Sequence, residues 1–271
     1  MSRFQYLFLS AFFLCGCADH PKGILANPLP DSDIPTLNYS VRHVYPHDTT
    51  SYTEGFLFRD HNFYESSGAP AEFPQTRSVI GVIDPASGRL DKKIEIDKHK
   101  YFGEGIAFFK DKLYQLTYKN HTGFIYDAKT FQRLDSFTFI NKEGWALTTD
   151  SISLIMSDGT SNLTFLDPAS LRPIKVITVT QNGTPLDSLN ELEYIKGYIY
   201  ANRFTQSYLV KIDPANGHVV AKLDLTTLVN EERNKNPGTD VLNGIAYDPG
   251  TDKIYVTGKL WSRIYEIDFS H

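Results

Sequence analysis

A glutamate or asparagine beside a glycine or leucine recurs along the chain at the start of apolar segments. The element occurs five times, at Glu54, Glu104, Glu143, Asn190-Glu191 and Asn243. Carboxylates that are packed closely raise one another's pKa, and a carboxyl group with a raised pKa can accept and return a proton near neutral pH. If the fold brings these side chains together, the sequence predicts a site for general acid and base catalysis. The structural alternative is that they accept hydrogen bonds from backbone amides and only join neighbouring elements.

A second recurring element is an aspartate that ends an apolar segment and begins a turn. It occurs at intervals of 40 to 55 residues, at Asp84, Asp127, Asp167, Asp213 and Asp268. Such an aspartate, followed by small and turn-forming residues, is typical of a tight turn, because its carboxylate bonds the backbone that follows and glycine adopts positive φ. The last interval is the longest, and a polar insert at 230–240 accounts for its additional residues.

Each unit of this repeat can supply four strands. An inner strand starts at the polar element, a Tyr-rich strand such as the one at Tyr114 follows about ten residues later, and two more strands flank the aspartate turn. Four strands in about 40 to 50 residues are typical of a β-propeller blade. The sequence therefore predicts an all-β fold, a five-bladed β-propeller over residues 38–271. The inner strands of a propeller converge on its axis, so the five polar elements should meet at one end of the central channel.

The start of the predicted propeller also has a role in closing the ring. Residues 38–45 alternate polar and apolar side chains and have no partner within the first unit. We expect this segment to pair with the last blade. The rival interpretation, two β-sandwich domains, would need a linker between them, and the regular spacing of the units leaves no room for one.

The composition agrees with an all-β protein and excludes several classes of site. Aromatic residues make up 13% of the 271 residues, with 16 Tyr and 18 Phe against 2 Met, which favours strands. The net charge is −5 and the charges are interspersed, so nothing indicates a nucleic-acid partner. The eight histidines lack the spacing of metal ligands, which argues against a metal-dependent hydrolase and predicts no metal site.

The N-terminal segment has the features of an export signal. An apolar run follows Arg3 and is too short to span a membrane. Both cysteines of the chain, Cys15 and Cys17, lie at its end, so the rest of the chain cannot form a disulfide. The sequence at 14–17, LCGC, resembles the lipobox of bacterial lipoproteins, in which lipidation of Cys17 would create the new N-terminus. We therefore predict a lipoprotein signal peptide over 1–17, a flexible tether over 18–37, and a periplasmic or cell-envelope location; the alternative is an ordinary cleaved secretory signal.

Eight segments resemble, in order and spacing, the glutaminyl cyclases (glutamine cyclotransferases) of the plant and bacterial propeller type. The resemblance extends from about residue 51 to residue 267, and the segments read YTEG at 52–55, FGEGI at 102–106, LYQLT at 113–117, EGWAL at 143–147, MSDGT at 156–160, LNELEY at 189–194, LNGIAYD at 242–248 and VTGKLW at 256–261. Each segment is a weak signal alone. Together they are specific, and they are independent of the repeat.

The resemblance implies an activity and a set of site residues. The family converts N-terminal glutamine of peptides and proteins into pyroglutamate with release of ammonia. It implies that Glu104 is the catalytic carboxylate and that Lys259 and Asn190 bind the reacting amide. The implied substrate-binding residues are Glu54, Phe102, Tyr118, Trp145 and Phe204. The structural alternatives are that Trp145 belongs to the propeller core and that Lys259 ends a solvated strand.

Three of these positions depart from the family pattern. Glu54 stands where members commonly carry Gln, and Tyr118 and Phe204 stand where they carry Trp. The departures bear on rate and substrate preference more than on the reaction. The resemblance implies no cofactor, although plant members can hold a structural calcium ion. We expect a monomer whose partners are peptides or exported proteins, and which meets the membrane only through its lipid anchor. The alternative function is a catalytically silent, tethered binding module.

Overall fold

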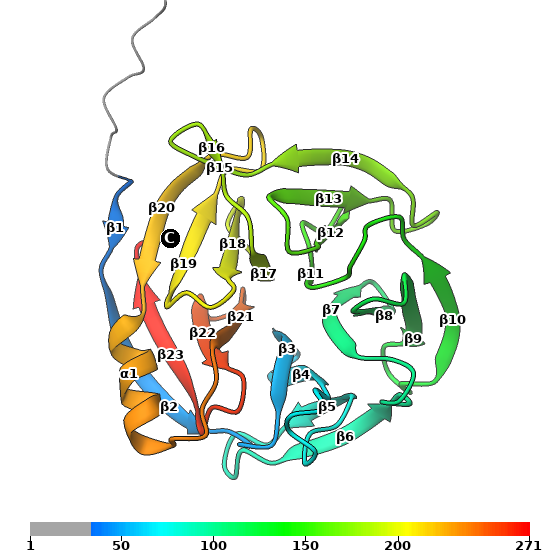
Figure 1. Cartoon of the computed structure of the whole chain (residues 1–271), viewed down its shortest axis with the longest axis horizontal. Coiled ribbons are helices and arrows are strands. Elements are labelled where there is room, and N and C mark those ends of the chain that lie inside the picture. The colour runs from blue at the N-terminus through cyan, green and yellow to red at the C-terminus, as the bar shows by residue number, and fades with distance from the viewer. Residues whose placement is uncertain (1–33) are drawn as a thin grey trace, which may run out of the picture. The chain divides into compact units, whose positions relative to one another are not determined.

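The computed structural model describes residues 34–271, so the predicted signal peptide, Cys17 and most of the predicted tether lie outside the described residues. Five antiparallel sheets stand around a common axis, as Figure 1 shows, which confirms the all-β fold and the five-bladed propeller. Each sheet contributes one strand to the axis. These inner strands are β3 (Tyr52–Arg59), β7 (Gly103–Phe109), β11 (Leu147–Thr149), β17 (Leu189–Ile195) and β21 (Leu242–Asp248).

The remaining strands of each blade follow outward in chain order. In the first three blades they are β4 (Asn62–Gly68), β5 (Val79–Ile83) and β6 (Leu90–Glu95), then β8 (Lys112–Thr117), β9 (Thr122–Asp127) and β10 (Arg133–Thr138), then β12 (Leu154–Ser157), β13 (Asn162–Leu166) and β14 (Pro173–Thr178). In the last two they are β18 (Tyr198–Arg203), β19 (Tyr208–Ile212) and β20 (Val219–Asp224), then β22 (Lys253–Gly258) and β23 (Arg263–Phe269). A short hairpin of β15 (Thr180–Gln181) and β16 (Thr184–Pro185) precedes the fourth blade.

The ring is closed by the beginning of the described chain. β2 (Tyr39–Pro46) lies antiparallel to β23 as the outer strand of the fifth blade, with Val44 opposite Tyr265. This pairing confirms the expectation for residues 38–45. β1 (Thr36–Leu37) pairs in parallel with β20 of the fourth blade. The predicted tether extended to residue 37, so its last two residues belong to the folded domain instead.

Turn chemistry and blade packing hold the repeat together. The carboxylate of Asp84 accepts a hydrogen bond from the amide of Ala86 at 2.9 Å, and Asp167 and Ala169 repeat this bond at the same distance. Between blades, apolar side chains interlock, and the largest cluster joins the fourth and fifth blades around the fully buried Trp261. Local turns therefore shape each blade, whereas burial of apolar surface between blades assembles the ring.

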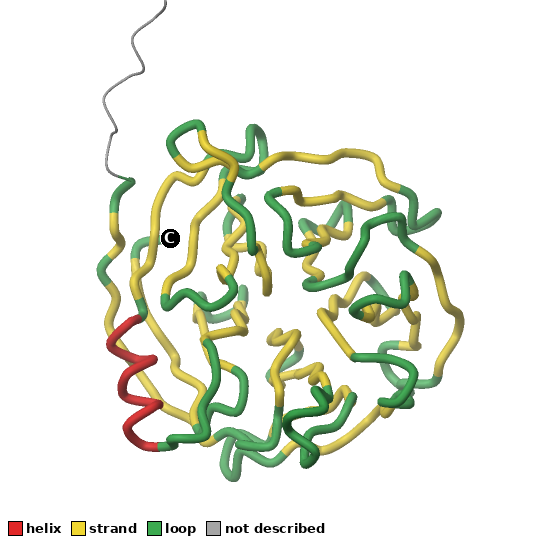
Figure 2. Tube along the Cα trace, viewed as in Figure 1, coloured by secondary structure: helices red, strands yellow, loops and turns green. Residues whose placement is uncertain are grey.

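A helix occupies the place of the predicted polar insert. α1 (Thr226–Lys235) lies between β20 and β21 on the outside of the ring, and Figure 2 shows it in red beside the strands. The helix was not predicted from the sequence, because only Leu228 and Val229 mark an apolar face among polar residues. Among residues 34–271, no helix combines the length and the apolar character that crossing a membrane requires.

Candidate active site

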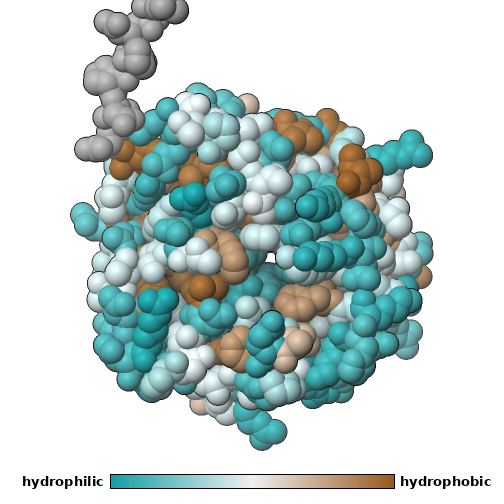
Figure 3. Space-filling model, viewed as in Figure 1, coloured by the Kyte–Doolittle hydropathy of each residue, from teal (hydrophilic) through white to brown (hydrophobic). Residues whose placement is uncertain are grey.

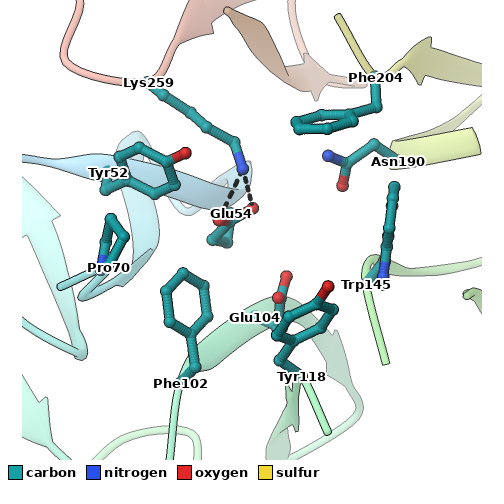
Figure 4. Close-up of a pocket in the computed structure, with 10 residues that line it drawn as sticks. All are labelled: Tyr52, Glu54, Pro70, Phe102, Glu104, Tyr118, Trp145, Asn190, Phe204 and Lys259. Atoms are coloured by element: carbon teal, nitrogen blue, oxygen red, sulfur yellow. Dashed lines mark hydrogen bonds and ion pairs between the residues drawn. The ribbon is translucent and has the colours of Figure 1, made fainter. Parts of the chain in front are cut away.

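A pocket of about 210 Å³ opens at one end of the propeller axis. Figure 3 shows a hollow near the centre of the face seen in Figure 1, with apolar and weakly polar side chains around it. Ten residues line the pocket and are drawn in Figure 4: Tyr52, Glu54, Pro70, Phe102, Glu104, Tyr118, Trp145, Asn190, Phe204 and Lys259. The eight residues that the sequence analysis assigned to catalysis and substrate binding all lie in this lining. They come from all five blades, so the pocket exists only when the ring is closed.

Glu104 lies on the inner strand β7 between two glycines. The amide of Gly105 donates a hydrogen bond to the carbonyl oxygen of Trp145 at 2.7 Å, and the hydroxyl of Ser66 donates to the carbonyl oxygen of Glu104 at 2.6 Å. A Cβ atom at Gly105 would lie 2.5 Å from the Cα of Ala146, so only glycine allows β7 to approach the third blade this closely. These contacts fix the backbone of Glu104 from both neighbouring blades.

The Glu104 side chain is available for chemistry. It is 4% exposed, and no hydrogen bond from residues 34–271 reaches its carboxylate, which is directed into the pocket in Figure 4. Burial raises its pKa well above the ordinary value, and the nearby charge of Glu54 raises it further, whereas Lys259 opposes the shift. Glu104 is thus a buried carboxyl group that keeps its proton to higher pH than an exposed carboxyl group does.

Lys259 and Glu54 form a buried ion pair at the side of the pocket. The ammonium Nζ lies 2.6 Å from both carboxylate oxygens, and both side chains are 4% exposed. The ammonium also lies 4.5 Å from the ring centre of Tyr52. Burial raises the pKa of Glu54 to about 6, although Lys259 acts to lower it. Lys259 is therefore buried against Glu54 and is not the solvated strand end of the structural alternative.

Aromatic rings form the walls of the pocket. Phe102 and Tyr118 are 5.9 Å apart between ring centres, and Trp145 meets Phe204 edge to face at 5.6 Å. Trp145 lies at the pocket surface and is not part of the propeller core. Its indole NH donates to the carboxylate of Glu143 at 2.9 Å. Glu143 therefore orients a wall residue rather than lining the pocket itself.

Asn190 lines the pocket, and the oxygen of its side-chain amide has no hydrogen-bond partner within the described residues. Its backbone oxygen accepts a hydrogen bond from Ser157 at 2.9 Å, which fixes the residue at the start of β17. Its side-chain Oδ1 is buried and has no hydrogen-bond partner within residues 34–271. A buried polar atom without a partner is costly. Such an atom is expected where a ligand completes the hydrogen bond.

Two of the repeated polar residues have the structural role that the alternative described. Glu191 accepts hydrogen bonds from the amides of Ile245 at 2.8 Å and Phe56 at 3.3 Å, so it joins the inner strands of three blades. Asn243 donates to the carbonyl oxygen of Thr53 at 2.9 Å. Neither residue lines the pocket. The repeat therefore brings polar residues to the axis, but only Glu54, Glu104 and Asn190 among them face the pocket.

The sequence analysis missed two lining residues, Tyr52 and Pro70. Tyr52 could have been found, since it lies two positions before Glu54 on one strand and alternate residues of a strand share a face. Pro70 lies in the turn after β4, and nothing in its sequence context indicates a pocket. Within the described range, no group of three or more His, Cys, Asp or Glu side chains is placed to hold a metal ion.

Comparisons with known proteins agree with this architecture. The family model described as glutamine cyclotransferase matches residues 11–269. A glutaminyl-peptide cyclotransferase of Arabidopsis thaliana is 33% identical over 225 residues, which are 82% of this chain and 68% of the relative. The crystal structure of Myxococcus xanthus glutaminyl cyclase is similar with a TM-score of 0.78 and 32% identity, over 87% of this chain and 98% of that chain. The chain belongs to the glutamine cyclotransferase family.

Proposed function

We propose that this protein is a glutaminyl-peptide cyclotransferase, an acyltransferase that converts N-terminal glutamine of peptides and proteins into pyroglutamate and releases ammonia. The observation that carries the proposal is Glu104, a buried carboxylate directed into an aromatic pocket with no hydrogen bond from residues 34–271. A propeller that served only as a binding module would have no need for such a group. Family membership supports the same reaction.

Glu104 is the general base and then the general acid of the proposed mechanism. The α-amine of the substrate attacks its own γ-carboxamide carbon, so a C–N bond forms and the amine loses a proton to Glu104. Glu104 then gives this proton to the departing amide nitrogen, which leaves as ammonia when its C–N bond breaks. The raised pKa of Glu104 lets the carboxyl group keep the proton between the two steps.

Asn190 and Lys259 lie where they can stabilise the oxyanion of the tetrahedral intermediate. The side-chain NH2 of Asn190 can donate a hydrogen bond to the oxyanion while its unpaired Oδ1 accepts one from the substrate, and Lys259 carries the positive charge. In other enzymes one such donor lowers the barrier by about 2.7–4 kcal/mol. The Glu54 carboxylate fixes the ammonium of Lys259 in the pocket, and it also competes with the oxyanion for that charge. Glu54 therefore influences how strongly Lys259 stabilises the oxyanion.

The aromatic walls of the pocket favour the bent conformation of the substrate's glutamine side chain that cyclisation requires. A glutamine side chain must bend back toward its own amine, and this costs conformational entropy that a shaped pocket offsets in advance. Phe102, Tyr118, Trp145 and Phe204 surround the space in front of Glu104. They also exclude water, which strengthens every electrostatic interaction in the pocket.

Location and partners complete the proposal. We propose that the chain is exported, that Cys17 is lipidated, and that it acts at the cell envelope as a monomer without a cofactor. The apolar run and the LCGC sequence at 14–17 support the anchor. The substrates would then be peptides or exported proteins that present an N-terminal glutamine.

The decisive experiment measures ammonia release from a glutaminyl dipeptide by the purified full chain. We expect stoichiometric ammonia and pyroglutamyl peptide. A peptide with an acetylated N-terminal glutamine is the control, because its nitrogen cannot attack, and it should release nothing. If glutaminyl peptides of varied second residue release no more ammonia than the acetylated control, the proposed function is wrong.

A further inference from the structure

The turn between β22 and β23 carries Lys259 to the pocket. Its next residue, Leu260, has a φ of 60°, a left-handed conformation that a branched side chain adopts only when its surroundings impose it. The backbone of Lys259 pairs with the segment before β21, donating to Val241 at 2.9 Å and accepting from Asp240 at 3.0 Å. The amide of Leu260 donates to the carbonyl oxygen of Ser51 at 2.8 Å. The turn is therefore held in a conformation that it would not adopt alone.

Helix α1 reaches this turn through a buried carboxylate. Glu232, which is fully buried, accepts hydrogen bonds from the amide of Ser262 at 2.9 Å and from its hydroxyl at 3.0 Å. The same carboxylate accepts from the hydroxyl of Tyr265 at 2.9 Å and forms an ion pair with Arg263. One helix residue thus contacts three residues at the start of β23, Ser262, Arg263 and Tyr265.

A second helix residue contacts the turn itself. The side-chain amide of Asn236, which follows the last turn of α1, donates to the carbonyl oxygen of Leu260 at 2.9 Å. Glu232 in the last turn of α1 and Asn236 at its C-cap therefore contact both ends of the turn. The helix belongs to the segment that lengthens the fifth repeat unit beyond the others. The lengthened unit therefore has a specific structural partner, the turn that carries Lys259.

We propose that Glu232 is a positioning residue for Lys259, an inference that rests on the proposed function. Glu54 fixes only the tip of the lysine side chain, whereas Glu232 fixes the backbone at Ser262, where the turn that carries Lys259 enters β23. An amide in place of the carboxylate loses the ion pair with Arg263 and keeps one acceptor oxygen instead of two, so Ser262 and Tyr265 cannot both keep their acceptor and the turn relaxes. A displacement of about 1 Å at a catalytic group can cost on the order of 10²-fold in rate.

The test is a double-mutant cycle between Glu232→Gln and Lys259→Ala, measured in the full chain with a glutaminyl dipeptide. Glu232→Gln should lower kcat about tenfold to a hundredfold with little change in KM, because Lys259 acts on the intermediate rather than on the bound substrate. In the Lys259→Ala background the same change should cost little further activity, because no lysine remains to be positioned. Melting temperature should fall equally in both backgrounds.

Two further variants separate positioning from general destabilisation. Asn236→Ala removes the bond to Leu260 and a local bond from the amide of Gly238, and it should lower kcat by a smaller factor, again only when Lys259 is present. Glu193→Ala is the matched control, since this carboxylate bonds the amide of Tyr247 at 3.2 Å and does not contact the turn. It should lower the melting temperature and leave kcat near wild type.

Some outcomes would overturn the inference. Wild-type kcat in both Glu232→Gln and Asn236→Ala would overturn it, and so would an equal loss with and without Lys259, which would mean that Glu232 only stabilises the fold. If Glu232→Gln does not fold, the Asn236→Ala cycle decides the matter by the same criteria. A wild-type chain that releases no ammonia would overturn the proposed function together with this inference, whereas an active chain with unaffected variants would overturn the inference alone.

Discussion

The ammonium of Lys259 lies 2.6 Å from both carboxylate oxygens of Glu54, and this contact gives the two carboxylates of the pocket different chemistry. Glu54 has a cation beside it and a pKa of about 6. Glu104 has no such partner, and burial raises its pKa well above the usual range. Environments that push the pKa values of two acids apart are a common way to divide their roles. Glu54 is the ionised partner, and Glu104 is the group that exchanges protons.

Replacing Glu104 by Gln separates catalysis from stability. The change keeps the side-chain volume but removes proton transfer, so kcat should fall about 10²- to 10⁴-fold. The folded-state pKa of Glu104 is raised, so its ionisation lowers the stability of the fold as pH increases from the unfolded value through the folded value. Glu104→Gln removes this loss. Its melting temperature should therefore equal that of wild type in acid and exceed it at alkaline pH.

Calorimetry and ammonia release on one preparation check this prediction. A variant that retains near wild-type activity would show that another carboxylate is the base. A melting temperature that falls in parallel with activity would mean that Glu104 ties blades together, as the structural alternative states.

Replacing Glu54 by Gln should move the pH dependence of the reaction toward acid. The charge of Glu54 raises the pKa of Glu104, whereas that of Lys259 lowers it. Without Glu54 the first effect is lost and Lys259 is unpaired, so both changes lower the pKa of Glu104. The rising limb of kcat/KM, which reports ionisation of the base in the free enzyme, should appear at lower pH.

A pH series on Glu54→Gln and on Glu143→Gln measures this shift. Glu143 also raises the pKa of Glu104, but less than Glu54 does, so its variant should shift the limb less. An unchanged limb in Glu54→Gln would mean that Glu104 does not govern the profile.

Substitution of Gly159 tests the aromatic wall through a matched pair of glycines. Gly159 and Gly183 have nearly equal φ values of 78° and 77°, so alanine at either position brings a similar backbone strain of about 1–2 kcal/mol. At Gly159 the added Cβ would lie 2.5 Å from the ring of Trp145, whereas at Gly183 nothing lies within 4 Å. Gly159→Ala should therefore displace the indole and lower kcat/KM by up to about 10²-fold.

The control variant Gly183→Ala should lose stability alone. Steady-state kinetics and thermal melting of the two variants give the comparison. Equal kcat/KM for both would mean that the position of the Trp145 ring does not matter to the reaction.

Replacing Cys17 by Ala tests the proposed anchor. A lipoprotein depends on this cysteine for its acyl chains, and several chains bury enough methylene groups to make membrane binding stable. The variant should move from the membrane fraction to the soluble fraction on cell fractionation and should keep its specific activity. Cys15→Ala is the control and should stay with the membrane. An unchanged membrane fraction for Cys17→Ala would contradict lipidation at this residue.

The blades could be predicted from sequence because their signals are local. The turn at Asp84, for example, is specified by residues within a few positions of it, and the same chemistry recurs in other units. The pocket lining could be predicted through motifs around Glu104, Asn190 and Lys259, whose spacing resembles one family. Tyr52 was missed although strand alternation placed it beside Glu54.

The remaining features depend on contacts that no local pattern records. Glu54 and Lys259 are 205 positions apart, and their pairing follows from closure of the ring rather than from either motif. The different roles of Glu104 and Glu191 also depend on contacts between segments that are distant in sequence. Both occupy the same place in their units, but amides from two other blades reach only Glu191. Helix α1 was not predicted because the residue that anchors it, the buried Glu232, lies in a polar segment whose sequence is typical of the protein surface.

The closure of the ring by β2 and β23 also constrains the order in which the protein can fold. Synthesis produces β2 first and β23 last, so the fifth blade cannot be completed until nearly the whole chain exists. Contacts between such distant segments are slow to form, because the intervening loop must be closed before they contribute. The pocket draws residues from every blade, so it depends on the ring that this pairing of the seven-residue strand β23 with β2 closes.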